Sequence, residues 1–265
     1  MRLKTRLVQY VVDFALAWRL LTIVPLPFIP DEPHPAPGRA AGYYPLVGLV
    51  LGLLLTGVGW GLFFFLPPNL AAALLLVVWV SLTGMLHLDG FMDSCDGLLP
   101  PRDPARRLEI MKDSRVGAFG VAGVILLLLI KFNALVALCD PYRLLVLIVT
   151  PVLARWAITW AMSRYPLARK EGLSVLFSTG LGRSQLVLAS AVAIFVAILL
   201  LGWLGVLLLG ATWLTTILVA RLALMRIGGL TGDVYGAIAE VVEVVSLIVV
   251  AVVCSSPTLT YNPFL

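Results

Sequence analysis

Long uninterrupted apolar runs constrain the fold of this chain more than any other feature of its sequence. Three of them read LAAALLLVVWVSLTGML (70–86), VAGVILLLLI (121–130) and LVLIVTPVLA (145–154). Of the 265 residues, 61% are hydrophobic and 12% are charged, whereas soluble domains are about half apolar and about one quarter charged. In a bilayer only helices and closed barrels satisfy every backbone polar group. Because the apolar residues run continuously rather than alternate, the sequence predicts an all-α integral membrane protein.

The length needed to cross a bilayer, about 20 mostly apolar residues, divides the chain into seven predicted spans within a single domain, 1–265. The predicted spans are 41–66, 70–88, 116–138, 144–162, 186–203, 206–225 and 234–254. An additional helix over 7–24 carries Asp13 and Arg19 among apolar residues. We expect this N-terminal helix to be amphipathic and to lie at the membrane interface without crossing.

Basic residues are distributed unevenly between the two sides that these spans define. With a cytoplasmic N-terminus, the segments 1–40, 89–115, 163–184 and 226–233 share the cytoplasmic side. They hold 15 of the 19 Lys and Arg residues: Arg2, Lys4, Arg6, Arg19, Arg39, Arg102, Arg106, Arg107, Lys112, Arg115, Arg164, Arg169, Lys170, Arg183 and Arg226. The opposite loops hold Arg143 alone. Since cytoplasmic loops carry an excess of Lys and Arg, this topology is favoured, and the net charge of +5 indicates no nucleic-acid module.

The stretch HLDGFMDSCDGLL (87–99) places three carboxylates directly after a predicted span. Asp89, Asp93 and Asp96 are spaced i, i+4 and i+7, which puts them on one helix face within about 10 Å along the axis. Such like charges repel, and an acid near lipid costs several kcal/mol unless it is paired or hydrated. Mg²⁺ binds carboxylate and phosphate oxygens together. The spacing therefore predicts a Mg²⁺ site on these three residues, against the alternative of a solvated helix end.

A second acidic set, Asp233, Glu240 and Glu243, also follows one helix stripe. Asp233 comes after the loop GGLTG (228–232), whose amides can approach an anion closely. We therefore expect Asp233 to line a ligand site. Glu240 and Glu243 lie inside a predicted span, and for them ion pairs with Arg155 or Arg221 within the bundle are an equal alternative.

The segment RRLEIMKDSRVGAFG (106–120) supplies basic partners before a predicted helix. Arg107, Lys112 and Arg115 are suited to phosphate, since Arg binds it bidentately and Lys acts as a point charge. Ser114 is expected to cap the helix, so that the first amides of the helix face an anion. Acidic side chains that bind Mg²⁺ and basic side chains that bind phosphate, together at one membrane face, are typical of enzymes of phosphoryl transfer.

The remaining candidate residues carry weaker predictions. Cys95, Cys139 and Cys254 are an odd number at unrelated positions, so we expect neither a disulfide framework nor a CxxC metal site. Cys95 is expected to be a small packing residue. His87, beside the aspartates, is at least as consistent with a packed histidine as with a ligand.

Three motifs, HLDGFMDSCDGL, RRLEIMKDSRVGAFG and GGLTGDVYGAIAEVVE, resemble the membrane-bound cobalamin synthase family, the adenosylcobinamide-GDP ribazoletransferases. YYPLVGLVLG (43–52) and RYPLARKEG (164–172) fit as well. The resemblance implies a Mg²⁺-dependent reaction at the inner membrane of a prokaryote. In that reaction a ribose hydroxyl of α-ribazole, or of its 5′-phosphate, attacks the cobinamide-side phosphate of adenosylcobinamide-GDP, and GMP leaves.

The resemblance also implies roles for matching residues. Asp89, Asp93 and Asp96 would be metal carboxylates, and Asp113 would complete the metal shell or take the ribose proton. Lys112, Ser114, Arg115 and Arg107 would hold phosphate, and Asp233 and Glu240 would line the substrate side. Here the aspartate motif is followed by Leu99-Pro100-Pro101-Arg102 in place of the family's small residues, so substrate detail is least transferable there. Assembly as a homo-oligomer, or with other enzymes of the corrinoid pathway, stays open.

Two other classes are weighed against this one. A CDP-alcohol phosphotransferase also uses helically spaced aspartates, but its typical D-x₂-D-G-x₂-A-R pattern does not match the four-residue step from Asp89 to Asp93. A divalent cation transporter would place acids near the centres of spans, often in inverted repeats. In this chain the aspartates lie at a span end, and only Glu240 and Glu243 favour transport.

Overall fold

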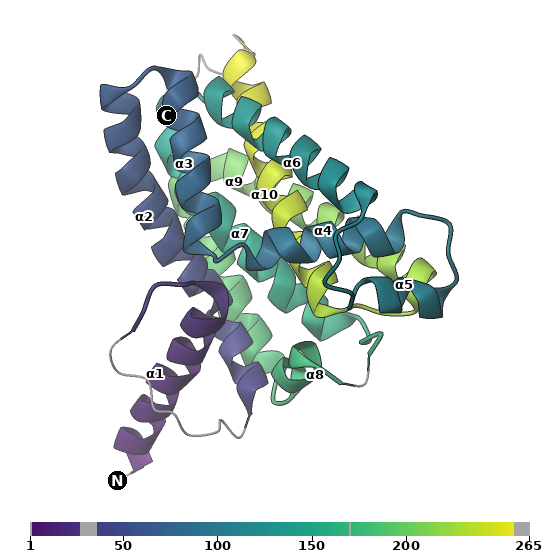
Figure 1. Cartoon of the computed structure of the whole chain (residues 1–265). Coiled ribbons are helices and arrows are strands. Elements are labelled where there is room, and N and C mark those ends of the chain that lie inside the picture. The colour runs from purple at the N-terminus through teal and green to yellow at the C-terminus, as the bar shows by residue number, and fades with distance from the viewer. Residues whose placement is uncertain (1, 27–35, 170, 257–265) are drawn as a thin grey trace.

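The computed structural model describes residues 2–26, 36–169 and 171–256, over which the chain is a bundle of helices (Figure 1). Of the basic residues used for the topology, Lys170 and the side chains of Arg2, Lys4 and Arg6 lie outside what is described. The elements are α1 Arg2–Leu21, η1 Pro37–Tyr43, α2 Tyr44–Phe65, α3 Pro68–Leu82, α4 Leu86–Leu98, α5 Pro104–Ile110, α6 Ala118–Ala137, α7 Tyr142–Arg164, α8 Leu173–Ser178, α9 Arg183–Ile227 and α10 Gly232–Ser255.

The helices long and apolar enough to cross a membrane number five in the described ranges, or six if α3 and α4 together count as one. The five are η1 with α2, α6, α7, α9 and α10. These helices cover the predicted spans 41–66, 116–138, 144–162 and 234–254. The most buried of the five is α7, which packs against α2, α9 and α10 at the centre of the bundle. The predicted class, a polytopic all-helical membrane protein, is confirmed.

Helix α9 comprises two arms that correspond to the predicted spans 186–203 and 206–225. Its backbone is non-helical at Gly202 (φ 53°, ψ −125°). A Cβ atom on Gly205 would collide with the carbonyl oxygen of Ala197, an approach that a straight helix does not allow. Ser190 and Trp213, on either side of Gly202, meet neighbouring turns of α7 through Trp156 and Trp160. The chain therefore folds back on itself, with one arm over each of these two predicted spans.

The predicted span 70–88 is wrong in its course, because the helix breaks before the aspartates. Helix α3 ends at Leu82, and α4 leaves it at an angle of 89°. Gly84 (φ 59°) and Met85 (φ 61°) form the break, and a right-handed helix cannot continue through such positive φ values. The acidic motif thus lies on a separate helix that runs across the ends of its neighbours (Figure 1).

Helix α1 covers most of the predicted helix 7–24 and is not among the helices apolar enough to span, as expected. Ala17, Trp18 and Leu21 join the buried core, while Asp13 pairs with Arg39 of η1 at 3.0 Å. The short helices α5 and α8 were not predicted.

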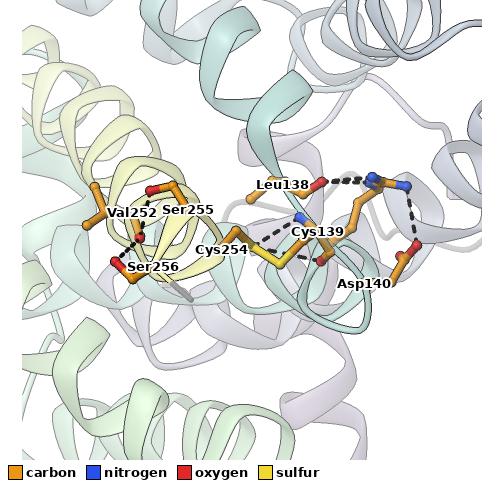
Figure 2. The surroundings of a disulfide bond; sticks show 8 residues. Leu138, Cys139, Asp140, Val252, Cys254, Ser255 and Ser256 are labelled. Atoms are coloured by element: carbon orange, nitrogen blue, oxygen red, sulfur yellow. Dashed lines mark hydrogen bonds and ion pairs between the residues drawn. A yellow bond between two sulfur atoms is a disulfide. The ribbon is translucent and has the colours of Figure 1, made fainter. Parts of the chain in front are cut away.

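The expectation that the chain has no disulfide is wrong, because Cys139 and Cys254 are bonded (Figure 2). Cys139 follows α6 and Cys254 lies in the last turn of α10, with their Cα atoms 5.5 Å apart. Nearby, Arg143 donates to the Leu138 carbonyl at 2.8 Å and pairs with Asp140 at 3.5 Å. Cys95 is free and buried, consistent with a packing role. The disulfide ties the end of the bundle that lies away from α8 and the start of α10 (Figure 1).

Candidate active site

Two glycines allow α4 and α10 to cross in close contact. A Cβ atom on Gly90 would lie 2.8 Å from the carbonyl oxygen of Asp233, and one on Gly236 would lie 2.9 Å from that of His87. Any larger side chain at either position would push the two helices apart. The crossing brings the start of the acidic helix α4 to the start of α10, which carries Asp233.

A second close contact, between the segment after α7 and the segment before α10, brings a positively charged side chain to Asp233. A short parallel bridge joins Leu167 to Leu230, with the Ala168 amide donating to the Leu230 carbonyl at 2.8 Å. This bridge places Arg169, just after α7, against α10, where its guanidinium lies 3.3 Å from the Asp233 carboxylate. The Thr231 hydroxyl donates to the same carboxylate at 3.1 Å.

These segments surround a cavity of about 310 Å³ at the end of the bundle where α7 ends and α10 begins. Three acidic side chains and one basic side chain border it: Asp89, Glu171, Asp233 and Arg169. Most of the remaining wall is apolar or aromatic and comes from α1, α2, α7, α8 and α10. The cavity therefore combines a charged side with an apolar interior.

The structure divides the three aspartates of α4 between two environments. Asp89 is exposed and borders the cavity, and half-buried Asp93 lies within electrostatic reach of Asp233, Asp89 and Arg169. Asp96 is buried and accepts hydrogen bonds from the amides of Gly117 and Gly120, both at 2.8 Å. Asp96 thus binds the positive N-terminus of α6, and its predicted metal role stays a prediction.

Ser114 does not cap the following helix, contrary to the prediction. The N-cap of α6 is Gly117, without a side-chain hydrogen bond, and Asp96 occupies the amides that Ser114 was expected to serve. Asp113 forms an ion pair with Arg115 at 2.6 Å. The hydrogen bonds and positive charge of Arg115 hold the pKa of Asp113 at about 2, well below the usual range. Lys112, Ser114 and Arg115 are exposed and do not border the cavity, so their phosphate roles stay predictions.

Arg107 is buried and has a different set of partners from the phosphate it was predicted to bind. Its guanidinium donates to the carbonyls of Gly97 at 2.7 Å, Leu98 at 2.6 Å and Arg102 at 2.8 Å. Gly97 and Leu98 are the last residues of α4, where carbonyls lack helical partners. Arg107 therefore caps the helix that carries the aspartates.

Glu240 and Glu243 form ion pairs inside the bundle, as the alternative reading expected, but of its two named partners only Arg155 takes part, together with Lys131. Lys131 of α6 lies 2.9 Å from Glu240 and 2.5 Å from Glu243, and Arg155 of α7 also pairs with Glu243. All four side chains are buried. Glu240 therefore faces a cation between α6 and α10, away from the cavity, and its predicted substrate role stays a prediction.

Sequence reasoning missed Arg169 and Lys131 as partners of the acidic residues. The sequence contains only a weak signal for Arg169, the motif RYPLARKEG, because its contact with Asp233 depends on a two-residue bridge. Lys131 is a lone cation in the apolar run after residue 120, and a charge at that depth is by itself a sign of a buried partner.

The crossing glycines give a first test of the site. Gly90→Ala adds a methyl group 2.8 Å from the Asp233 carbonyl, so α4 must shift and carry Asp89 with it. We expect turnover to fall about a hundredfold, the usual cost of misplacing reacting groups by about 1 Å. The matched control is Gly57→Ala on α2, where a Cβ atom meets open space and activity should be unchanged. Equal activity of the two variants in a product-release assay would contradict this role.

The fold and the cavity together define a multi-pass helical membrane protein with an acid-lined site suited to phosphoryl transfer. The chain belongs to the cobalamin-5-phosphate synthase family, whose model matches residues 13–251. It is 38% identical over 231 residues to the adenosylcobinamide-GDP ribazoletransferase of Roseiflexus sp. (strain RS-1), an alignment that covers 87% of this chain and 86% of the relative. It is 41% identical over 244 residues to the protein of that name from Brevibacillus brevis, covering 89% and 96%. No solved structure matches the chain.

Proposed function

We propose that this chain joins adenosylcobinamide phosphate, taken from adenosylcobinamide-GDP, to a ribose hydroxyl of α-ribazole or of its 5′-phosphate. The observation that carries the proposal is the convergence of Asp89, Asp233 and Arg169 on one cavity in a member of this family. These residues come from three separate segments of the chain, and all three segments lie within the matched region.

The reaction balances with the groups at the cavity. The ribose oxygen forms a bond to the cobinamide-side phosphorus, and the bond from that phosphorus to the bridging oxygen breaks, so that GMP leaves. The hydroxyl proton passes to a carboxylate that borders the cavity, Asp89 or Asp233. Arg169 supplies a fixed positive charge for the diphosphate as negative charge develops on it. Asp113 is a poor base in comparison, because its hydrogen bonds with Arg115 lower its pKa.

The donor set at the cavity fits the Mg²⁺ that the family resemblance implies. Asp89 and Asp233 border the cavity and offer carboxylate oxygens, which Mg²⁺ prefers, and half-buried Asp93 lies within electrostatic reach of both. Mg²⁺ needs only one or two carboxylates besides phosphate and water. Within residues 2–26, 36–169 and 171–256, no three acidic, His or Cys side chains are arranged to bind an ion by themselves. We therefore assign Asp89 and Asp233, which both border the cavity, to hold Mg²⁺ together with the substrate diphosphate, whose charge the ion would neutralise. Asp96 keeps α4 against α6.

The direct test uses the purified protein in detergent with adenosylcobinamide-GDP, α-ribazole and Mg²⁺, and follows GMP and cobalamin by chromatography. We expect both products in equal amounts. A parallel reaction with CDP-diacylglycerol and an alcohol acceptor should give no CMP. CMP release without GMP release would replace this function with that of a CDP-alcohol phosphotransferase.

We further propose that the cavity faces the cytoplasm across a prokaryotic inner membrane. Arg164 ends α7, Arg183 and Arg226 lie in the first and last turns of α9, and Arg169 borders the cavity, in agreement with the excess of basic residues on a cytoplasmic face. The Cys139–Cys254 disulfide lies at the opposite end, and disulfides persist in oxidising compartments outside the cytosol. Self-association, or association with other corrinoid enzymes, stays a prediction.

Cysteine labelling tests this orientation. Ser163 and Ser255 are exposed at opposite ends of the bundle, and the native cysteines are either bonded or buried. In intact cells a membrane-impermeant maleimide should label Ser255→Cys and spare Ser163→Cys, which reacts only after the membrane is opened. The reverse pattern would invert the topology.

A further inference from the structure

The interior of the cavity is apolar, in contrast to its charged border. Leu20 and Leu21 of α1, Ile158 and Met162 of α7 and Phe177 of α8 all line it. Ile158, Leu21 and Phe177 belong to the buried core. An apolar wall of this kind suits an uncharged aromatic group, because burying such a group removes apolar surface from water without stranding polar atoms.

One polar side chain on this wall lacks a partner. His87 is only 3% exposed, lines the cavity, and its Nδ1 atom has no hydrogen-bond partner in the described structure. Buried polar groups in native proteins are almost always hydrogen-bonded. His87 therefore adds one unsatisfied polar group to an otherwise apolar wall, which is consistent with a ligand that carries few polar atoms.

We propose that the cavity binds the acceptor nucleoside, with its aromatic base in the apolar interior beside His87 and its ribose toward Asp89 and Asp233. This inference rests on the proposed function and adds which of the two substrates the cavity takes. The base of α-ribazole is a dimethylbenzimidazole, which has two methyl groups and a single free ring nitrogen. Its chemistry matches an apolar wall with one unpaired imidazole nitrogen.

Size and polarity exclude the other substrate from the interior. Ligand cavities range from about 300 to about 1,000 Å³, and this one, at about 310 Å³, holds one base with its sugar and not a corrin ring with a nucleotide. The guanine of the donor has several donors and acceptors on its edge, and burying them among Leu20, Met162 and Phe177 would leave them unpaired.

The test separates the two substrates by their KM values. Met162→Trp adds bulk to the wall at a half-buried position. We expect the KM for α-ribazole to rise about tenfold or more while the KM for adenosylcobinamide-GDP changes less than about twofold, the former equal to a loss of about 1.4 kcal/mol of binding. The matched control is Met225→Trp on α9, which is 77% exposed and should leave both KM values unchanged. A rise confined to the KM for the donor would overturn the assignment and leave the proposed function standing.

Binding without turnover keeps the inference testable if a variant folds poorly or if the reaction fails. Calorimetry on the intact wild-type protein with α-ribazole alone should show binding, and guanosine should not compete for it. Met162→Ala, which widens the cavity, should accept a riboside with a larger base better than the wild type does. Equal displacement of α-ribazole by guanosine, or no preference of Met162→Ala for the larger base, would overturn the assignment even if GMP release were normal.

Discussion

Asp89→Asn should abolish GMP release while leaving the helical fold intact. The substitution keeps the size of the side chain and removes its negative charge at a position that is exposed and borders the cavity. A carboxylate that would hold the Mg²⁺ of the diphosphate, or take the ribose proton, acts mainly in the transition state, so we expect kcat to fall about a thousandfold. The measurement is GMP release at saturating substrates and Mg²⁺, with circular dichroism and gel filtration in detergent as the tests of folding.

The same substitution at an outlying carboxylate separates a local role from a general effect of charge. Glu109 pairs with Arg106 at 2.5 Å on α5, and its side chain is 68% exposed. Glu109→Gln therefore removes the same charge at a solvated helix pair and should leave turnover unchanged. Near-normal turnover of Asp89→Asn, or an equal loss in both variants, would contradict the assigned role.

Asp93→Asn and Asp96→Asn extend this result to the other two aspartates. Asp93 should follow Asp89, because it shares the electrostatic environment of Asp233. Asp96→Asn should instead weaken the contact between α4 and α6, since its two oxygens accept the amides of Gly117 and Gly120. We therefore expect its loss of activity to come with a lower melting temperature.

The helical phase of the acidic motif was predictable from the sequence, and its division between two environments was not. The i, i+4, i+7 spacing sets a common face on any helix. Which neighbours meet that face depends on the break between α3 and α4 at Gly84 and Met85. This break could not be predicted, because the apolar run of the sequence continues through it. After an 89° bend, the far end of α4 meets α6 and its near end meets α10.

Long-range pairings account for most of what the sequence did not predict. The disulfide joins residues 115 positions apart, and Arg169 reaches Asp233 through a bridge of two residues. Arg107 belongs to a basic motif that resembles a phosphate site, yet it serves the carbonyls of α4. Residue type and spacing indicate what a side chain can bind, whereas tertiary packing decides which partner it meets.

The second prediction with a large expected effect concerns the charged side chains that are buried between α6, α7 and α10. Lys131 and Arg155 face Glu240 and Glu243, so that two positive and two negative side chains are buried together. Lys131 also lies 4.8 Å from the centre of the Trp79 ring. Lys131→Met leaves Glu240 without its cation in an apolar bundle. Removing one partner of a buried pair costs about 3–5 kcal/mol, and we expect the unfolding free energy in detergent to fall by that amount.

A compensating variant decides whether the lost stability comes from the stranded charge. Lys131→Met combined with Glu240→Gln removes one charge of each sign and keeps the Arg155–Glu243 pair. It should recover most of the lost unfolding free energy, because a neutral replacement of a buried pair is often close to neutral in stability. Arg106→Met, at an exposed pair, serves as the control and should cost less than about 1 kcal/mol. If Glu240→Gln alone abolished turnover without loss of stability, the substrate role first predicted for Glu240 would replace the structural one.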